Sequence, residues 1–575
     1  MRLSSTSPLF RPTHQLVVYC VLVGLLGALA ALAFDAMVDL VQHHLLGGIG
    51  QYYPPSTSNP ENLSIPTGWQ RLWLPLATTL GGLLSGWLVY RWAPEAEGHG
   101  TDGAIGAYHR RGGEVRARIP LIKALASAFT IGSGGVAGRE GPTAQISVGL
   151  GAALARVVQL RGQERRSLLL ASMAAGLAAM FRAPLGMAIF SVEILYSGMV
   201  FESEALIYTV IAAVTSYACY GLVAGWEPLF SLPQELKIEE PGIFLAFGLL
   251  GVLAGLLGAV LPALLYRVRD LFRRLPGPPH IRPAIGGLLV GLIALAVPEI
   301  LGTGYGWVEL AMLGRLSLTT ILLLLLLKAP AMALTIGSGG SGGVFAPTVT
   351  IGAMLGAAVG TILNMVLPNA DAPVAGFVVV GMAAVFSGAA RTPISTLIMV
   401  AEMTGGYALI APAMLANIMA FMVQRSLTTN SPYPTLYESQ VETREDSPLH
   451  RGVFVRRAME MLDAGGLEPS EVTLPRLVSL LRFGESIPIS EGGETLVTLT
   501  VEPGSQLDGL TVAEAFGQTR GLTAVAVIRG PELLTPRGDT RFAAGDQFLA
   551  VTKPDYHPEL VRLVRRRITE DRDEE

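Results

Sequence analysis

The stretch Gly132-Ser-Gly-Gly-Val-Ala-Gly-Arg-Glu-Gly-Pro-Thr143 decides the fold, because it interrupts a long apolar region with glycines, a proline and one acid, Glu140. A second stretch, Gly337-Ser-Gly-Gly-Ser-Gly-Gly-Val-Phe-Ala-Pro-Thr348, repeats it 205 residues later. Four glycines, the proline and the threonine keep their places, while Phe345 stands where the first copy has Glu140.

A second pair of motifs follows the first pair in the same order. Arg182-Ala-Pro and the later Glu193 match Arg391-Thr-Pro and the later Glu402, at a separation of 209 residues. Two ordered pairs with nearly equal spacing indicate an internal duplication. The alternative, a chance likeness between glycine-rich membrane helices, does not account for the second pair.

The composition is that of a protein that crosses a membrane several times. Of 575 residues, 51% are hydrophobic and only 15% are charged, whereas soluble domains carry about 25% charged residues. Apolar runs long enough for spans or half-spans lie at 15–34, 73–92, 242–266, 284–298 and 318–335. Cys20 and Cys219 lie in apolar runs and give neither a disulfide framework nor a metal-ligand spacing. We expect no metal and no cofactor.

Changes in composition divide the chain into segments. A proline-rich break at 276–283 separates the duplicated halves, and charged and turn residues increase after Arg425. We expect an N-terminal leader at 1–13, an all-α polytopic transmembrane domain at 14–445 with repeat halves at about 71–275 and 284–428, a helical linker at 446–490, a small α+β domain at 491–567 and a charged tail at 568–575.

The last domain has a β-like pattern. Alternating or β-branched runs predict strands at 495–501, 523–528 and 547–552, with Gly, Pro and Asp turns between them. Residues 511–518 and 555–567 favour helices.

Two glycine-rich breaks at membrane depth point to an anion site. Irregular backbone in a membrane is tolerated where its free N–H groups face a cavity or a ligand. A helix N-terminus adds about half a positive charge and binds anions through those groups. The breaks lack the Gly-Lys-Ser/Thr ending of a phosphate-binding P-loop. The pattern therefore predicts two helix N-termini that converge on one anion.

Glu140 lies inside the first break, and a carboxylate at this depth is rare and usually functional. It competes with the anion for the same N–H groups, and protonation releases it. The alternative is a structural ion pair with Arg139, but adjacent residues on a helix point apart. We therefore interpret Glu140 as a gate.

Three motifs together resemble the CLC family of chloride channels and transporters over about residues 14–445: Gly-Arg-Glu-Gly-Pro at 138–142, Gly-Val-Phe-Ala-Pro at 343–347, and Arg391-Thr-Pro before a helix ending in Glu402-Met-Thr. The resemblance implies a homodimer with one anion pathway per subunit and two halves of inverted topology with broken helices. It also implies a multi-pass protein of the bacterial inner membrane, with the lipid bilayer, chloride and protons as its partners.

The resemblance assigns roles to individual residues. Glu140 corresponds to the gating glutamate, and Val344 and Phe345 to the residues whose N–H groups hold the anion. Tyr437 resembles the tyrosine whose hydroxyl closes the inner side, with Tyr433 as the weaker candidate. The remaining expected anion-binding residues are His99, Gly100, Arg139 and Gly141.

Two positions depart from the family pattern. The family's first motif is usually Gly-Ser-Gly-Ile-Pro, and its serine hydroxyl contacts the anion. The corresponding run here is Gly98-His99-Gly100-Thr101-Asp102, so His99 stands in place of that serine. His99 contributes an imidazole N–H, contributes only its backbone, or is structural. Ile194 stands at the position of the inner proton-accepting glutamate, and Ile194 cannot titrate. Glu140 and, more weakly, Glu193 remain for a proton pathway, although Glu402 at the equivalent place argues that Glu193 is structural.

The segments at 499–514, 523–530 and 544–551 resemble the TrkA-C regulatory module of potassium transport systems. The resemblance implies a cytoplasmic dimer that senses a small ligand such as a cyclic dinucleotide. The alternative is a dimerising or stabilising appendage. A Gly-x-Gly-x-x-Gly fingerprint is absent from the sequence, so NAD is not expected.

We therefore expect chloride transport gated by Glu140, either as a passive channel or as a Cl⁻/H⁺ antiporter. One alternative is transport of another anion, nitrate or fluoride. The other is a membrane sensor that signals through its C-terminal domain. No catalytic constellation of paired acids or of Ser and His is apparent, so neither an enzyme nor a nucleic-acid partner is expected.

Overall fold

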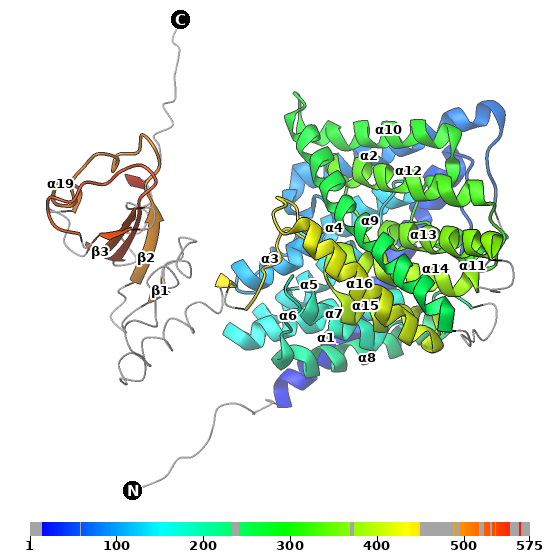
Figure 1. Cartoon of the computed structure of the whole chain (residues 1–575), viewed down its shortest axis with the longest axis horizontal. Helices are drawn as coiled ribbons and strands as arrows, with labels where there is room; N and C mark the ends of the chain where they lie inside the picture. The colour runs from blue at the N-terminus through cyan, green and yellow to red at the C-terminus, as the bar shows by residue number, and fades with distance from the viewer. Residues whose placement is uncertain are drawn as a thin grey trace, which may run out of the picture. The chain divides into compact units, whose positions relative to one another are not determined.

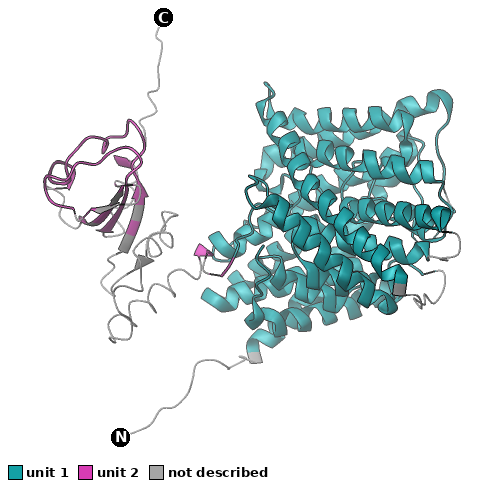
Figure 2. Cartoon of the chain, in the orientation of Figure 1, with its two compact units in different colours: residues 1–442 teal, residues 443–575 magenta. Residues whose placement is uncertain are grey.

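The computed structural model describes residues 14–57, 59–61, 63–232, 241–367, 373–444, 446–448, 487–488, 495–516, 522–529, 532–534, 536–552, 560 and 563–564. The chain forms two compact units, Met1–Glu442 and Thr443–Glu575 (Figure 2). The expected leader at 1–13, most of the expected linker at 446–490 and the expected tail at 568–575 lie outside the described residues.

The regular secondary structure described in unit 1 consists of helices joined by loops, as the apolar composition predicts. Eight of these helices are long and apolar enough to cross a membrane. The α-helices, shown in Figure 1, are α1 (His14–Val41), α2 (Trp73–Trp92), α3 (Thr101–Arg110), α4 (Ile119–Gly132), α5 (Glu140–Val157), α6 (Gly162–Phe181), α7 (Pro184–Glu193), α8 (Leu206–Ala224), α9 (Pro241–Arg274), α10 (Arg282–Ala296), α11 (Tyr305–Met312), α12 (Leu318–Gly337), α13 (Phe345–Val366), α14 (Val374–Ala390), α15 (Pro393–Thr404) and α16 (Ile410–Thr428).

The order of these helices shows the duplication. Helices α1 to α8 and α9 to α16 follow the same sequence of long and short elements. Helix α1 packs against α8 as α9 packs against α16, and α2 and α10 pack on each other (Figure 1). Because α9 matches α1, the second half begins with α9, which differs from the expected junction at 276–283.

Glycine ends the helices at both breaks. Helix α4 ends at Gly132 and α12 at Gly337, and Gly134 and Gly339 follow with the same φ of 100°. Residues that carry a Cβ rarely adopt this backbone conformation. The chain therefore turns at equivalent points, and α5 and α13 begin a few residues later.

Close backbone contacts hold the helices of unit 1 together. A Cβ added at Gly356 of α13 would lie 1.9 Å from the carbonyl oxygen of Phe377 in α14, and one at Gly352 would lie 2.4 Å from that of Gly381. Membrane helices approach this closely only through small residues, which accounts for the high glycine content.

Unit 2 contains an antiparallel sheet in the order β1-β2-β5-β3-β4. Its strands are β1 (Ile487–Pro488), β2 (Thr495–Thr500), β3 (Leu522–Arg529), β4 (Glu532–Leu534) and β5 (Gln547–Thr552). The three predicted strands match β2, β3 and β5, and Val497, Val527 and Phe548 form part of the core.

A short helix, α19 (Val512–Phe516), begins with a capping box. The backbone N–H of Thr511 donates to Glu514 at 2.8 Å, and the N–H of Glu514 donates to the Thr511 hydroxyl at 3.2 Å. Residues 517–518 of the predicted helix lie outside the described residues, as does most of the helix predicted at 555–567.

Candidate anion-binding site

The two glycine-rich breaks meet directly. The N–H of Gly138 donates to the carbonyl of Gly343, and the N–H of Gly343 donates to the carbonyl of Gly138, both at 2.7 Å. The turn before α3 joins them, because the N–H of Gly342 donates to the carbonyl of Gly98 at 3.1 Å. Three turns, each followed by a helix N-terminus, therefore lie in contact.

A small cavity of about 10 Å³ lies where these N-termini converge. The structure brings together five of the expected site residues around it. The cavity is lined by Thr101, Glu140, Gly141, Leu177, Phe181, Met187, Phe190, Val344, Phe345, Met399 and Tyr437. Most of these residues are apolar. The polar side chains among them are the hydroxyls of Thr101 and Tyr437 and the carboxylate of Glu140.

The Glu140 side chain is buried, with 3% of its surface exposed. Its Oε1 accepts a hydrogen bond from the Tyr305 hydroxyl, whereas its Oε2 is buried with no hydrogen-bond partner among the described residues. A Cβ added at Gly343 would lie 3.1 Å from this Oε2, so the carboxylate lies close to the N-terminus of α13, where an anion would bind.

Arg139 points elsewhere, although it adjoins Glu140 in sequence. Its guanidinium bonds to Asp35 at 2.6 Å and to Asp39 at 2.7 Å, both in α1. These residues line a cavity of about 290 Å³ that also includes Tyr305, and we call it the Tyr305 cavity. The arginine therefore pairs with two acids of α1 and is not among the residues lining the small cavity.

His99 and Gly100 line a third cavity, of about 200 Å³, which we call the His99 cavity. The His99 Nε2 lies 3.1 Å from Asp102, while its Nδ1 is buried with no hydrogen-bond partner among the described residues. The imidazole packs edge-on against Tyr437, with ring centroids 5.4 Å apart. The structure thus places His99 beside the small cavity, behind Tyr437.

Tyr433, the weaker candidate for the inner tyrosine, lies away from the small cavity. Its hydroxyl donates to Asp270 near the end of α9. Tyr437 is 3% exposed and lines the small cavity together with Glu140 and Phe345.

Glu193, at the end of α7, caps the N-terminus of α15, and Glu402, near the end of α15, caps the N-terminus of α7. Glu193 accepts from the N–H groups of Ile394 at 3.2 Å and Ser395 at 2.7 Å, at the start of α15. Glu402 accepts from the N–H groups at the start of α7, Leu185 at 3.2 Å and Gly186 at 2.8 Å. The two acids therefore bind helix N-termini symmetrically, and neither lines the small cavity.

Two buried lysines support the turns and were missed in the sequence. Lys123 Nζ donates to the carbonyls of Ala96 at 3.0 Å and Gly98 at 2.7 Å. Lys328 Nζ donates to the carbonyls of Ile300 at 2.9 Å and Gly302 at 3.0 Å. The two lysines stand 205 residues apart.

A third repeated motif in the sequence could have pointed to these lysines and to Tyr305. Pro94-Glu-Ala-Glu-Gly-His-Gly100 and Pro298-Glu-Ile-Leu-Gly-Thr-Gly304 share Pro-Glu and Gly-x-Gly at a separation of 204 residues. Tyr305, which follows the second copy, is therefore equivalent to Thr101. The described ranges of the chain hold no group of three or more His, Cys, Asp or Glu residues placed to bind a metal ion.

Comparison with known proteins gives two family matches. The model of a family described as voltage gated chloride channel matches residues 81–425, and that of the TrkA-C domain matches residues 496–564. A ClcB-like chloride channel protein of Ralstonia nicotianae is 31% identical over 419 residues, which cover 72% of this chain and 94% of that protein. The H⁺/Cl⁻ exchange transporter ClcA of Vibrio campbellii is 32% identical over 372 residues, covering 64% and 79%.

Solved structures show the same fold. A slow cyanobacterial Cl⁻/H⁺ antiporter matches with a TM-score of 0.63 and 22% identity, covering 73% of this chain and 96% of that one. A CLC-type fluoride/proton antiporter matches with a TM-score of 0.62 and 22% identity, covering 75% and 98%. The expected broken-helix membrane fold is confirmed.

Proposed function

The chain belongs to the voltage gated chloride channel family, and from that premise we propose that it carries chloride across a membrane, past Glu140. The observation that carries the proposal is the convergence of three helix N-termini on a small cavity that also contains a buried carboxylate. Helix N-termini supply partial positive charge and free N–H donors. They attract a halide without the tight binding that a full positive charge would give.

The backbone N–H groups of Val344 and Phe345 and the Tyr437 hydroxyl bind the dehydrated anion in this account. The residues that carry these donors are buried. The walls of the small cavity include Phe181 and Phe345, whose ring centroids lie 4.6 Å apart. Exclusion of water strengthens each donor–anion interaction. His99 lies behind Tyr437 and acts on the anion through that ring or through the backbone of its turn.

Glu140 is the gate in this proposal. When ionised, its carboxylate lies near the start of α13 and obstructs the pathway between the small cavity and the Tyr305 cavity. Protonation removes the charge that holds it there, so the side chain leaves and chloride enters. Chloride flux then rises as the pH falls.

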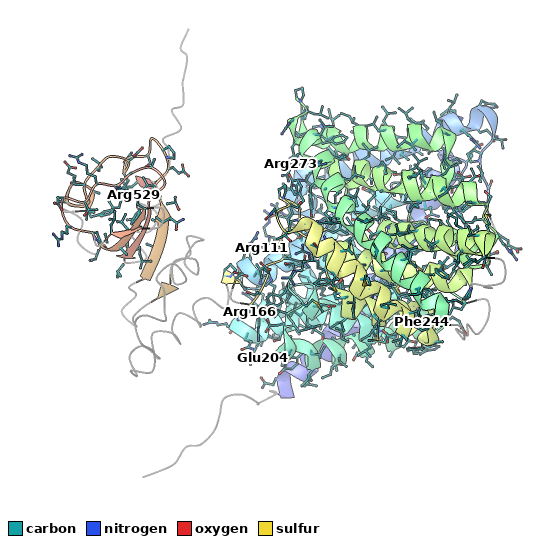
Figure 3. All side chains as sticks on the ribbon, in the orientation of Figure 1. Arg111, Arg166, Glu204, Phe244, Arg273 and Arg529 are labelled. Carbon is teal, nitrogen blue, oxygen red and sulfur yellow. The ribbon has the colours of Figure 1, made fainter. Side chains whose placement is uncertain are left out.

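The distribution of arginines supports an orientation in the membrane. Figure 3 shows Arg111, Arg166 and Arg273 along one edge of unit 1, and Arg273 also lines the His99 cavity. Because arginine-rich loops favour the cytoplasmic side, we place the His99 cavity there. We further propose a homodimer with one pathway per subunit, in a bacterial inner membrane, with the TrkA-C unit in the cytoplasm as a regulatory or dimerising domain.

The remaining choice is between passive conduction and exchange for protons. The exchange transporter of V. campbellii supports exchange, whereas Ile194 is fully buried and apolar at the position of the expected inner acid. Reversal potentials of the reconstituted protein under combined chloride and pH gradients separate the two. A potential that ignores the pH gradient shows a channel, and one that shifts with it shows exchange. Absence of any chloride flux would refute the proposed function.

A further inference from the structure

Tyr305 contacts Glu140 but, unlike Tyr437, does not line the small cavity. It is the first residue of α11, its hydroxyl donates to Glu140 Oε1, and its side chain lines the Tyr305 cavity. Glu140 lines the small cavity. The hydrogen bond therefore joins two residues that line different cavities.

The surroundings fix the Tyr305 hydroxyl in place. Its ring packs edge-on against Phe230, with centroids 5.3 Å apart. The turn before it is held by Lys328, which donates to the carbonyls of Ile300 and Gly302. Gly304 has a φ of 93°, and a Cβ there would lie 2.8 Å from Lys328 Nζ. The donor is therefore preorganised for the carboxylate.

We propose that Tyr305 is a latch, a positioning residue whose hydroxyl holds the ionised Glu140 side chain across the pathway and so sets how readily the gate opens. The inference rests on the proposed function of Glu140. A hydrogen bond to a carboxylate is worth more than a neutral one, and it favours the ionised, closed form. Breaking the bond lets the side chain leave at a higher pH.

The other charged and titratable groups near Glu140 do not replace this contact. Tyr437, from the segment after α16, lines the small cavity together with Glu140. Arg139 is adjacent but paired with the acids of α1, Asp35 and Asp39. On the side of α3, His99 and Asp102 pair with each other at 3.1 Å and line the His99 cavity.

The test is chloride efflux from proteoliposomes across a range of pH, with Tyr305→Phe as the variant. It removes the hydroxyl and keeps the ring against Phe230. We expect the pH of half-maximal flux to rise by about one unit, a tenfold change in the proton affinity of the gate. Tyr220→Phe is the matched control, because it breaks a 2.8 Å bond to Asp35 in the same cavity and is expected to keep the wild-type midpoint.

Two backgrounds show whether Tyr305 acts through Glu140. Combined with Glu140→Gln, Tyr305→Phe should change neither the flux nor its flat pH profile. Combined with Glu140→Asp, whose shorter side chain does not reach the hydroxyl, it should add no shift. An unchanged midpoint in Tyr305→Phe alone, or an equal change of flux in the Glu140→Gln background, overturns the latch. A wild-type pH dependence that survives Glu140→Gln instead overturns the gate itself.

Discussion

Gly138 and Gly343 exchange two backbone hydrogen bonds of 2.7 Å, and they occupy equivalent positions in the two copies of the glycine-rich break. The bonds form a single antiparallel bridge between segments 205 residues apart. Each bond satisfies a donor and an acceptor that would be costly to leave unpaired at membrane depth. The pair thereby fixes the starts of α5 and α13 against each other, at the small cavity where we propose that the anion binds.

Gly141→Ala tests the close approach of these turns. A Cβ at Gly141 would lie 1.8 Å from the carbonyl oxygen of His99 and 3.1 Å from the Cα of Gly343. Because backbone atoms would have to move, we expect a loss of stability of about 1–3 kcal/mol and reduced chloride flux. The thermal midpoint in detergent is the measurement. Gly242→Ala is the control, since it meets no atom within 4 Å, and an equal loss in both variants would contradict the account.

Glu193→Gln and Glu402→Gln test the reciprocal caps. Each substitution weakens a charge-assisted interaction with a helix N-terminus, so each should lower stability by about 1–2 kcal/mol. Because neither acid lines the small cavity, the pH of half-maximal flux should stay at the wild-type value. A shifted midpoint or a lost proton coupling in Glu193→Gln alone would assign Glu193 to a proton pathway.

Lys328→Met and Lys123→Met form a matched pair. Lys328→Met removes the donor of the Ile300 and Gly302 carbonyls, and each unsatisfied group costs about 1–3 kcal/mol. After Lys123→Met, the carbonyl of Ala96 still accepts from the Ser341 hydroxyl and that of Gly98 from the N–H of Gly342. We therefore expect Lys328→Met to lower the thermal midpoint more than Lys123→Met. Lys328 also supports the turn that carries Tyr305. We therefore expect only Lys328→Met to raise the pH of half-maximal flux. If the two variants had the same pH of half-maximal flux, Lys328 would have no specific effect on the Tyr305–Glu140 contact.

Much of this arrangement was predictable from the sequence, because glycine, proline and buried acids leave strong local signals. The two long motifs gave the duplication, the broken helices and Glu140, and alternating residues gave β2, β3 and β5. The comparisons and the structure confirm the membrane fold and the small C-terminal α+β domain.

The partners of the gate were harder to predict, since they depend on which turns meet in space. Tyr305 stands 165 residues after Glu140 and matches Thr101 only in position, not in type. Lys123 and Lys328 lie in apolar runs, where a lone cation gives no sign of the carbonyls it will contact. The destination of the Arg139 guanidinium also depends on α1, which carries Asp35 and Asp39 more than 90 residues earlier.

In unit 2, we predict that Asp546 makes the stability depend on pH. Burial opposes ionisation, but the Arg529 guanidinium at 2.7 Å and the Ala543 N–H at 2.8 Å outweigh it and lower the pKa of Asp546 below its ordinary 3.8. The stabilisation is therefore complete above that ordinary value and is lost as the pH falls through the lowered pKa.

Asp546→Asn should accordingly destabilise β3 and β5 at neutral pH and flatten the acid dependence of their stability. Hydrogen exchange of the full-length protein at residues 522–529 and 547–552 measures this. Asp539→Asn, at an exposed turn position, should match the wild type. Identical exchange in Asp546→Asn and the wild type at neutral pH would contradict the assignment.

The most direct test of the gate is chloride flux through reconstituted Glu140→Gln as a function of pH. Glutamine nearly keeps the size of the side chain but cannot ionise, so the competing charge at the start of α13 is gone. The account predicts a flux that stays open and constant from acidic to neutral pH, while the wild-type flux falls as the pH rises. A Glu140→Gln flux that retained the wild-type pH dependence would contradict it.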